Sequence, residues 1–108
     1  MRTLKIHLIR HGATDANYDG RYIGCKTDLP LAPEGLNELR LLKDDIDYPE
    51  IERLYSSPML RCRQTGAVLY PDFEPFTVEE LKEYDFGSFE NKTAAELESN
   101  PNFIPWTS

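Results

Sequence analysis

The stretch of this chain that decides its fold is LKIHLIRHG, residues 4–12. Its first part is mostly apolar, which predicts a central strand over residues 3–9 that is covered on both faces. After the strand, Gly12 lets the backbone turn tightly and approach a ligand closely. Arg10 offers a planar set of donors to phosphate or carboxylate oxygens, and His11 can act as a nucleophile or base near neutral pH. The alternative is a strand that ends in a surface Arg-His pair.

Length and composition fit one globular domain. The chain has 108 residues, of which 40% are hydrophobic and 29% are charged. Its 12 basic and 19 acidic residues give a net charge of −7. Such a balance argues against a nucleic-acid partner, because nucleic-acid binding needs clustered basic charge. Two or three converging arginines can nevertheless form a positive pocket for a small anion.

The cysteines and apolar segments favour a cytoplasmic protein with no metal, no cofactor and no membrane partner. Cys25 and Cys62 lie outside any CxxC pair or Cys/His cluster. We interpret Cys62 as a helix-packing residue, although the neighbouring arginines could lower the pKa of its thiol. No segment approaches the roughly 20 apolar residues of a membrane span, and the N-terminus has no apolar stretch of signal length.

The remaining pattern alternates strands and helices and predicts an α/β fold, with a largely parallel sheet and helices on both of its faces. The expected elements are a loop over 13–33, a helix over 33–47, a strand over 52–56, a helix over 58–70 capped by Ser57, a strand over 76–78, and a short helix that begins at the cap Thr93 and runs to about Ser99.

The C-terminal residues indicate that the domain is incomplete. Phe103, Ile104 and Trp106 form an apolar tail that needs burial, and three strands make a thin parallel sheet. A homo-oligomer, or contact with the missing C-terminal part, would cover such a tail. We therefore interpret residues 1–108 as the N-terminal part of a single α/β domain.

Polar segments follow each of the three predicted strands, namely residues 10–17, 56–65 and 81–90. In doubly wound folds ligands bind at the carboxyl ends of the strands. We therefore expect His11, two or three arginines and the carboxylate of Glu83 to converge there. Phosphoryl transfer requires such a nucleophile, fixed positive charge for the phosphoryl oxygens, and an acid for the leaving group.

In these segments the chain resembles the histidine phosphatase superfamily, which includes the phosphoglycerate mutases. The resemblance rests on ordered blocks across residues 4–90. They are Leu8-Ile9-Arg10-His11-Gly12, its continuation through Thr14, Asn17, Arg21, Gly24, Asp28 and Leu31 to Gly35, then Ser56-Ser57-Pro58 through Arg61 to Thr65, and Glu83-x-x-x-Gly87-x-Phe89-Glu90.

The resemblance implies a catalytic role for four residues. His11 would attack phosphorus and become a transient phosphohistidine, which water hydrolyses. Arg10 and Arg61 would hold the phosphoryl oxygens. Glu83 would protonate the leaving oxygen and then activate the water. The alternatives are a solvated helix residue for Arg61 and a solvated carboxylate for Glu83.

The same resemblance implies that three further residues bind substrate. Asn17 would add a neutral donor, and Ile23 and Gly24 would line the substrate side through backbone contacts. No metal ligands are implied. Cofactors are not implied either.

The activity implied is hydrolysis of a small phosphorylated metabolite by a phosphomonoesterase. A phosphoglycerate mutase is the first alternative, disfavoured because Ala13-Thr14 stands where mutases commonly carry Glu-Ser. The second is a truncated, non-catalytic phosphate-binding or interaction protein. The family has a second catalytic histidine on a later strand, whereas this chain contains only His7 and His11.

Overall fold

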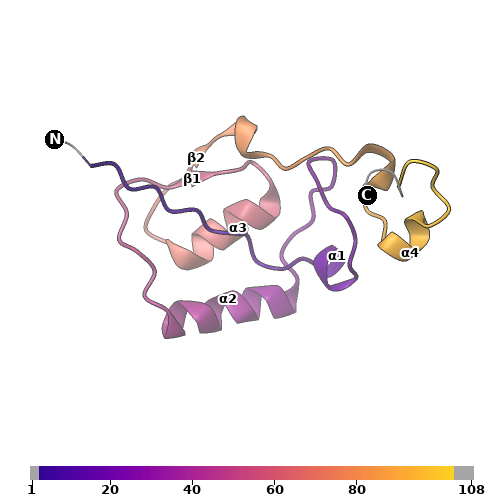
Figure 1. The fold of residues 1–108 in the computed structure, drawn as a ribbon. Coiled ribbons are helices and arrows are strands. Elements are labelled where there is room, and N and C mark those ends of the chain that lie inside the picture. The colour runs from indigo at the N-terminus through magenta and orange to yellow at the C-terminus, as the bar shows by residue number, and fades with distance from the viewer. Residues whose placement is uncertain (1–2, 104–108) are drawn as a thin grey trace.

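The computed structural model describes residues 3–103 as short elements joined by long irregular segments (Figure 1). In chain order these are α1 (Asp15–Tyr18), α2 (Pro33–Asp45), β1 (Tyr55–Ser56), α3 (Leu60–Leu69), β2 (Phe76–Thr77), the 3-10 turns η1 (Glu79–Leu81) and η2 (Gly87–Phe89), and α4 (Ala94–Leu97). The strands β1 and β2 pair in parallel, with Tyr55 opposite Phe76. The α/β class with a parallel sheet is confirmed, although each strand is shorter than predicted.

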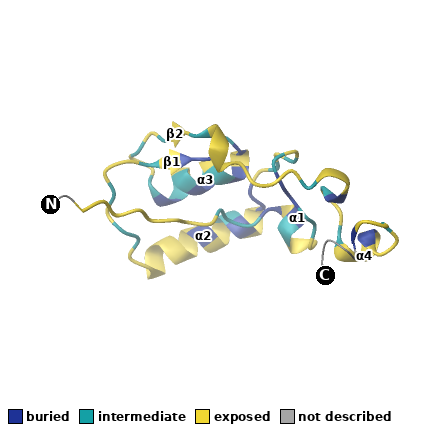
Figure 2. Cartoon of the chain, turned by 45° about the horizontal axis from the view of Figure 1, so that its top comes forward, coloured by how far each residue is buried: buried dark blue, intermediate teal, exposed yellow. Residues whose placement is uncertain are grey.

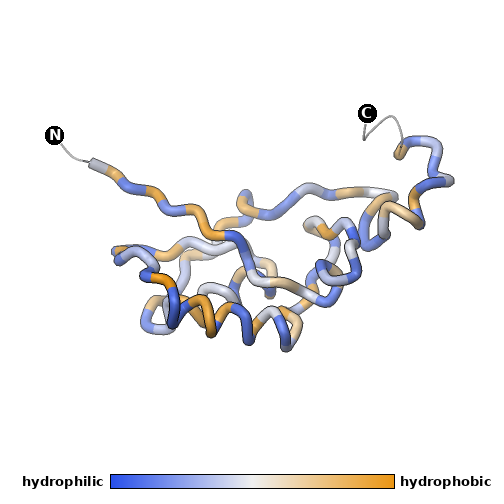
Figure 3. The backbone as a smooth tube through the Cα atoms, turned by 60° about the horizontal axis from the view of Figure 1, so that its bottom comes forward, coloured by the Kyte–Doolittle hydropathy of each residue, from blue (hydrophilic) through white to orange (hydrophobic). Residues whose placement is uncertain are grey.

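The predicted strand over residues 3–9 is wrong for the described structure. Residues 3–10 are exposed and belong to no helix or strand, as the yellow segment near the N-terminus in Figure 2 shows. Figure 3 shows hydrophobic and hydrophilic stretches alternating along this segment, and Leu8 is 91% exposed. A strand needs a neighbouring backbone for its N–H and C=O groups. Within residues 3–103, no backbone hydrogen bond joins this segment to β1 or β2.

The helix α3 lies between the strand pair and α2 (Figures 1 and 2). α2 begins at Pro33, as predicted, because a first helical position has no intrahelical partner for the N–H that proline lacks. A buried cluster of Leu31, Leu39 and Leu69 joins the two helices and the loop before α2. Both helices lie on the same side of the two-stranded sheet. A sheet with helices on both of its faces therefore stays a prediction for a larger sheet.

The start of α3 differs from the prediction. Ser57 is not the helix cap, because its Oγ accepts from the Met59 N–H at 3.3 Å, before the helix begins. The first helical residue, Leu60, donates its N–H to Oδ1 of Asp28 at 2.7 Å. A carboxylate at a helix N-terminus satisfies a free N–H and interacts favourably with the helix dipole. The cap is thus supplied from the loop before α2.

The segment over residues 13–33, predicted to be loop throughout, contains the short helix α1. Thr14 caps it, with its Oγ1 accepting from the Asn17 N–H at 3.3 Å, while Asn17 Oδ1 accepts from the Thr14 N–H at 2.9 Å. This reciprocal capping box explains why four residues form a helical turn inside an irregular segment.

The C-terminal part of the described chain forms a second core. Phe89, Leu97 and Phe103 are buried together. Thr93 caps α4 as predicted, by accepting from the Glu96 N–H at 3.1 Å. Phe103 is therefore buried and is not part of an exposed tail, whereas residues 104 and 106 of the predicted tail lie outside the described residues.

Because its two cores lie apart, the described chain is less compact than a typical domain of this length. α4 lies apart from α2 and α3 in Figure 1. The radius of gyration is 16.2 Å, whereas a compact domain of this length has about 13 Å. Within residues 3–103, no helix is long and apolar enough to cross a bilayer.

Candidate active site

His11 follows the exposed N-terminal segment, and its ring is held by the main chain. Nδ1 lies 2.5 Å from the carbonyl oxygen of Gly12. Because a carbonyl oxygen only accepts, Nδ1 carries the proton and donates it. In the neutral ring the unshared electron pair is therefore on Nε2. That nitrogen lies 3.2 Å from Oε1 of Glu83, which is within hydrogen-bond distance.

Arg61 lies in the first turn of α3, and its side chain is fully buried. Nη1 donates to the carbonyl oxygen of Thr27 at 2.7 Å, and Nη2 donates to that of Gly24 at 3.3 Å. Nη2 also lies 3.5 Å from Glu83 Oε1. Nε has no hydrogen-bond partner among the described residues. A buried cation with one unused donor favours pairing with an anion.

A cavity of about 520 Å³ lies beside His11. Five of the residues predicted for the site line it, namely Arg10, His11, Asn17, Ile23 and Glu83. Arg61 and Gly24 are absent from its lining. They contact each other, and Arg61 also contacts the lining residue Glu83. The structure thus brings the predicted residues together around one cavity and its wall.

The cavity is locally positive within an acidic chain. Arg10, Arg21 and the carboxylate of Glu83 line it, and Arg61, which is outside the lining, contacts Glu83. Arg21 is neutralised in part by Glu96, with Nη1 and Oε1 2.9 Å apart. Arg10 is exposed and makes no hydrogen bond or ion pair within residues 3–103. Arg10 therefore has all its guanidinium donors available to an anion in the cavity.

The three predicted substrate-binding residues occupy different positions. Asn17 is fixed by its Oδ1, which accepts from the backbone and hydroxyl of Thr14, so its amide nitrogen is left for a ligand. Ile23 is buried in the cavity wall. Gly24 fits closely against the chain, because an added Cβ would lie 1.7 Å from the carbonyl oxygen of Tyr84.

Two residues that support the site, Thr65 and Glu90, have no role predicted from the sequence. Thr65 Oγ1 accepts from the Gly12 N–H at 2.9 Å and donates to the Arg61 carbonyl at 2.8 Å, so it ties the His11 loop to α3. Its position four residues after Arg61 on a helix permits that second bond. Glu90 binds Gly24 from a distance of 66 residues along the chain, and no sequence pattern signals this contact.

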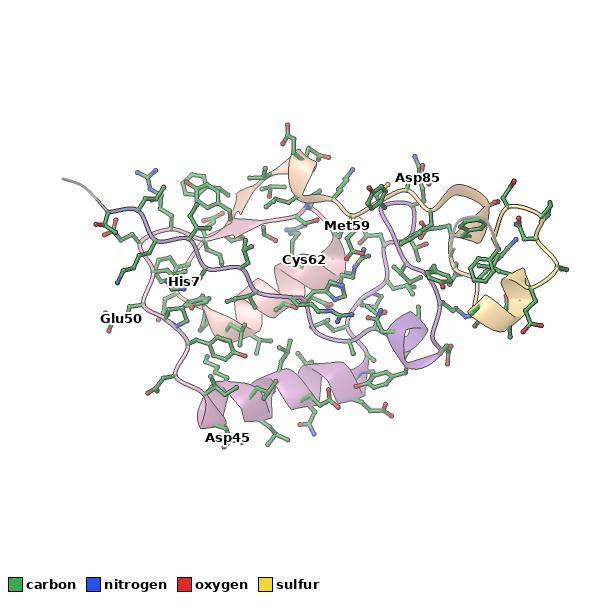
Figure 4. The ribbon with its side chains drawn as sticks, in the orientation of Figure 1. His7, Asp45, Glu50, Met59, Cys62 and Asp85 are labelled. Atoms are coloured by element: carbon green, nitrogen blue, oxygen red, sulfur yellow. The ribbon has the colours of Figure 1, made fainter. Side chains whose placement is uncertain are left out.

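Cys62 lies on α3 at the cavity, as marked in Figure 4. Burial raises the pKa of its thiol above the ordinary value, whereas a hydrogen bond with Ser57 and the charge of Arg61 lower the pKa by less. This direction favours the packing interpretation over an activated thiol. Within residues 3–103, no group of three or more His, Cys, Asp or Glu side chains is placed to hold a metal ion.

Comparison with known proteins identifies one family. The profile of the histidine phosphatase superfamily (branch 1) matches residues 6–108. The adenosylcobalamin/alpha-ribazole phosphatase of Salmonella typhimurium is 27% identical over 107 residues, which are 95% of this chain and 52% of that protein.

Two solved structures superpose well on the chain. The phosphoserine phosphatase of Entamoeba histolytica, in complex with 3-phosphoglyceric acid, gives a TM-score of 0.76 at 32% identity, over 89% of this chain and 48% of that one. The alpha-ribazole phosphatase of Shigella flexneri gives a TM-score of 0.77 at 28% identity, over 92% of this chain and 50% of that one. The chain thus spans about half the length of the relatives it matches.

Proposed function

The chain belongs to the histidine phosphatase superfamily, and from that premise we propose that it supplies the nucleophile and the acid of a phosphomonoester hydrolase. The substrate is a small phosphorylated metabolite, and no metal or cofactor takes part. One observation carries the proposal: Nδ1 of His11 is anchored to a carbonyl while Nε2 faces Glu83 at a positive cavity.

The geometry supports a two-step reaction. Nε2 of His11 attacks phosphorus, the N–P bond forms, and the P–O bond to the leaving group breaks. The proton on the carboxyl group of Glu83 passes to the leaving oxygen. Water then attacks phosphorus, the Glu83 carboxylate takes its proton, and the N–P bond breaks to release phosphate. His11 returns to its neutral form.

The other site residues stabilise the charge on the phosphoryl oxygens. Arg10 and Arg61 supply guanidinium donors to these oxygens, and Asn17 supplies a neutral amide. Ile23 lies in the cavity wall, and we propose that Gly24 acts from outside the lining, through its carbonyl bond to Arg61. We propose further that residues 1–108 are the N-terminal part of one domain, whose larger parallel sheet has helices on both faces, in a cytoplasmic enzyme.

The relatives support a small phosphorylated substrate. Their names refer to adenosylcobalamin, alpha-ribazole and phosphoserine, and the Entamoeba histolytica structure contains 3-phosphoglyceric acid. Phosphoserine and 3-phosphoglyceric acid are small phosphomonoesters, and the other two names likewise belong to phosphatases. The shared chemistry is a phosphomonoester, which is what His11 and the arginines are placed to recognise.

Hydrolysis of p-nitrophenyl phosphate by the wild type, His11→Ala and His7→Ala tests the proposal. We expect turnover by the wild type and His7→Ala and none by His11→Ala, because His7 is outside the proposed machinery. Rapid quenching and intact mass measurement should show one phosphoryl group on the wild type, labile to acid and stable to base. Turnover by His11→Ala would overturn the proposal.

A second candidate is a non-catalytic phosphate-binding protein. It is favoured by the sequence, which has only His7 and His11, whereas the family uses a second histidine. Phosphate binding that depends on Arg61, with no turnover of any phosphomonoester, would support this candidate. Isomerisation of phosphoglycerate without net phosphate release would instead support a mutase.

A further inference from the structure

Glu90 forms the densest set of hydrogen bonds behind the cavity. The Gly24 N–H donates to both of its oxygens, at 3.2 Å to Oε1 and 2.9 Å to Oε2. The Thr27 hydroxyl donates to Oε2. The Phe86 N–H lies 3.4 Å from Oε1. One partly buried carboxylate thus gathers donors from Gly24 and Thr27, 66 and 63 positions before it, and from Phe86, 4 positions before it.

The two residues that Glu90 binds in the 24–27 loop are the same two that hold Arg61. Gly24 and Thr27 donate to Glu90 with an N–H and a hydroxyl, and both accept from Arg61 with their carbonyl oxygens. The loop therefore lies between a carboxylate and a guanidinium. If the loop loses its hydrogen bonds to Glu90 and moves, the carbonyl oxygens that accept from Arg61 move with it.

The fit of this loop leaves little room for adjustment. The Cys25 N–H donates to the Tyr84 carbonyl at 2.9 Å, beside the close contact of Gly24 with that carbonyl. Arg61 is fully buried, so water cannot replace a lost carbonyl acceptor. The direction of the Arg61 guanidinium therefore depends on where the loop places the carbonyl oxygens of Gly24 and Thr27.

We propose that Glu90 is a positioning residue, which sets the direction of the Arg61 guanidinium through Gly24 and Thr27. The proposal rests on the proposed function, in which Arg61 binds the phosphoryl group. Glu90 touches neither the substrate nor His11. It acts by holding the loop whose carbonyl oxygens accept from the phosphate-binding arginine.

Glu90→Gln is the sharpest substitution, because it keeps the size of the side chain. Both oxygens of Glu90 accept from the Gly24 N–H, so either orientation of the new amide places an NH₂ donor against that donor. Glu80→Gln is the matched control, since Glu80 is exposed and lies outside the network. Thr27→Val removes only the hydroxyl donor, and Thr27→Ser keeps it, should Glu90→Gln fold poorly.

The first measurement does not depend on activity. In the wild type the Nε–H of Arg61 should give an NMR signal that exchanges slowly with water, because the side chain is buried. We expect faster exchange and a shifted signal in Glu90→Gln and Thr27→Val, and a wild-type signal in Glu80→Gln and Thr27→Ser. An unchanged Arg61 signal in Glu90→Gln would overturn the proposal whether or not the chain is an enzyme.

The second measurement links the network to phosphate. We expect Glu90→Gln to weaken binding of inorganic phosphate and to lower kcat/KM for p-nitrophenyl phosphate on the order of 10- to 100-fold, because small misplacements of binding groups cost that much. In an Arg61→Ala background, Glu90→Gln should cause no further loss of phosphate affinity. Losses that multiply would show that Glu90 acts independently of Arg61 and would overturn the proposal.

The two measurements separate the two hypotheses. A wild type that neither binds phosphate nor turns over contradicts the proposed function, while the Arg61 signal still decides whether Glu90 positions the guanidinium. An active wild type with an unaffected Glu90→Gln variant contradicts the role of Glu90 alone.

Discussion

Nε2 of His11 and Oε1 of Glu83 lie 3.2 Å apart, and the same carboxylate oxygen lies 3.5 Å from Nη2 of Arg61. Glu83 thus places an oxygen between the nucleophilic nitrogen and the buried guanidinium, where an oxygen of a phosphoryl group would make the same contacts. In the proposed reaction, the Glu83 side chain must move aside before Nε2 of His11 can attack phosphorus. It is 43% exposed and lies in an irregular segment, so it has room to do so.

Glu83→Gln should lower kcat for phosphomonoester hydrolysis about 10²- to 10³-fold, because an amide cannot donate a proton to the leaving oxygen and then accept one from water. The loss should be greater for alkyl phosphates than for p-nitrophenyl phosphate, whose leaving group needs less protonation. Steady-state kinetics with both substrates checks this, with Glu80→Gln as control. An equal loss for both leaving groups would argue against Glu83 as the acid.

Thr65→Val should destabilise the chain by about 1–3 kcal/mol, because the partly buried Gly12 N–H loses its acceptor. It should also lower kcat/KM, since Gly12 holds the His11 ring. Thr65→Ser keeps both hydrogen bonds and should restore most of the activity. Urea unfolding and phosphatase assays measure the two effects, with the exposed Thr77→Val as control. Wild-type stability in Thr65→Val would refute this view of Thr65.

Gly24→Ala should destabilise the chain by about 2–3 kcal/mol, because the added Cβ would lie 1.7 Å from the Tyr84 carbonyl and the backbone must shift. Gly66→Ala, in α3, is a milder control. Its added Cβ would lie 3.3 Å from a methyl group of the flexible Leu54 side chain. Thermal unfolding compares the two. Equal unfolding temperatures for the two variants would contradict the close contact of the 24–27 loop with Tyr84.

The Cys62 thiol should react more slowly with iodoacetamide at pH 8 than free cysteine does. Burial raises its pKa, so less of the reactive thiolate is present, and the half-buried position restricts access. The rate should increase as the pH rises toward the raised pKa. Peptide mapping after timed alkylation measures this rate. A rate above that of free cysteine would instead indicate an activated thiol at the cavity.

Several elements could be predicted from the sequence because their causes are local. α2 starts at Pro33, which suits a first helical position, and α4 starts after Thr93, which caps it. The capping box of α1 is equally local, and the prediction of a loop there overlooked the pair Thr14 and Asn17. Resemblance to a family placed His11 and Glu83 at one site, and the structure brings them into contact.

Other features depend on partners far along the chain. Asp28 satisfies the first N–H of α3, and nothing near residue 60 predicts this. The apolar pattern of residues 3–9 favours a strand, yet the segment is exposed and unpaired in the described structure. A pattern of side chains shows that a segment can form a strand, whereas the backbone partner that completes it must come from elsewhere.

The sequence by itself determined which groups are present and in what order: a histidine beside a glycine, basic residues and a glutamate, in the order typical of one family. Only the tertiary structure decided how these groups are held. It places Glu90 and Arg61 on opposite sides of Gly24 and Thr27, because hydrogen bonds of fixed length and direction between distant segments arise from packing, which local sequence does not encode.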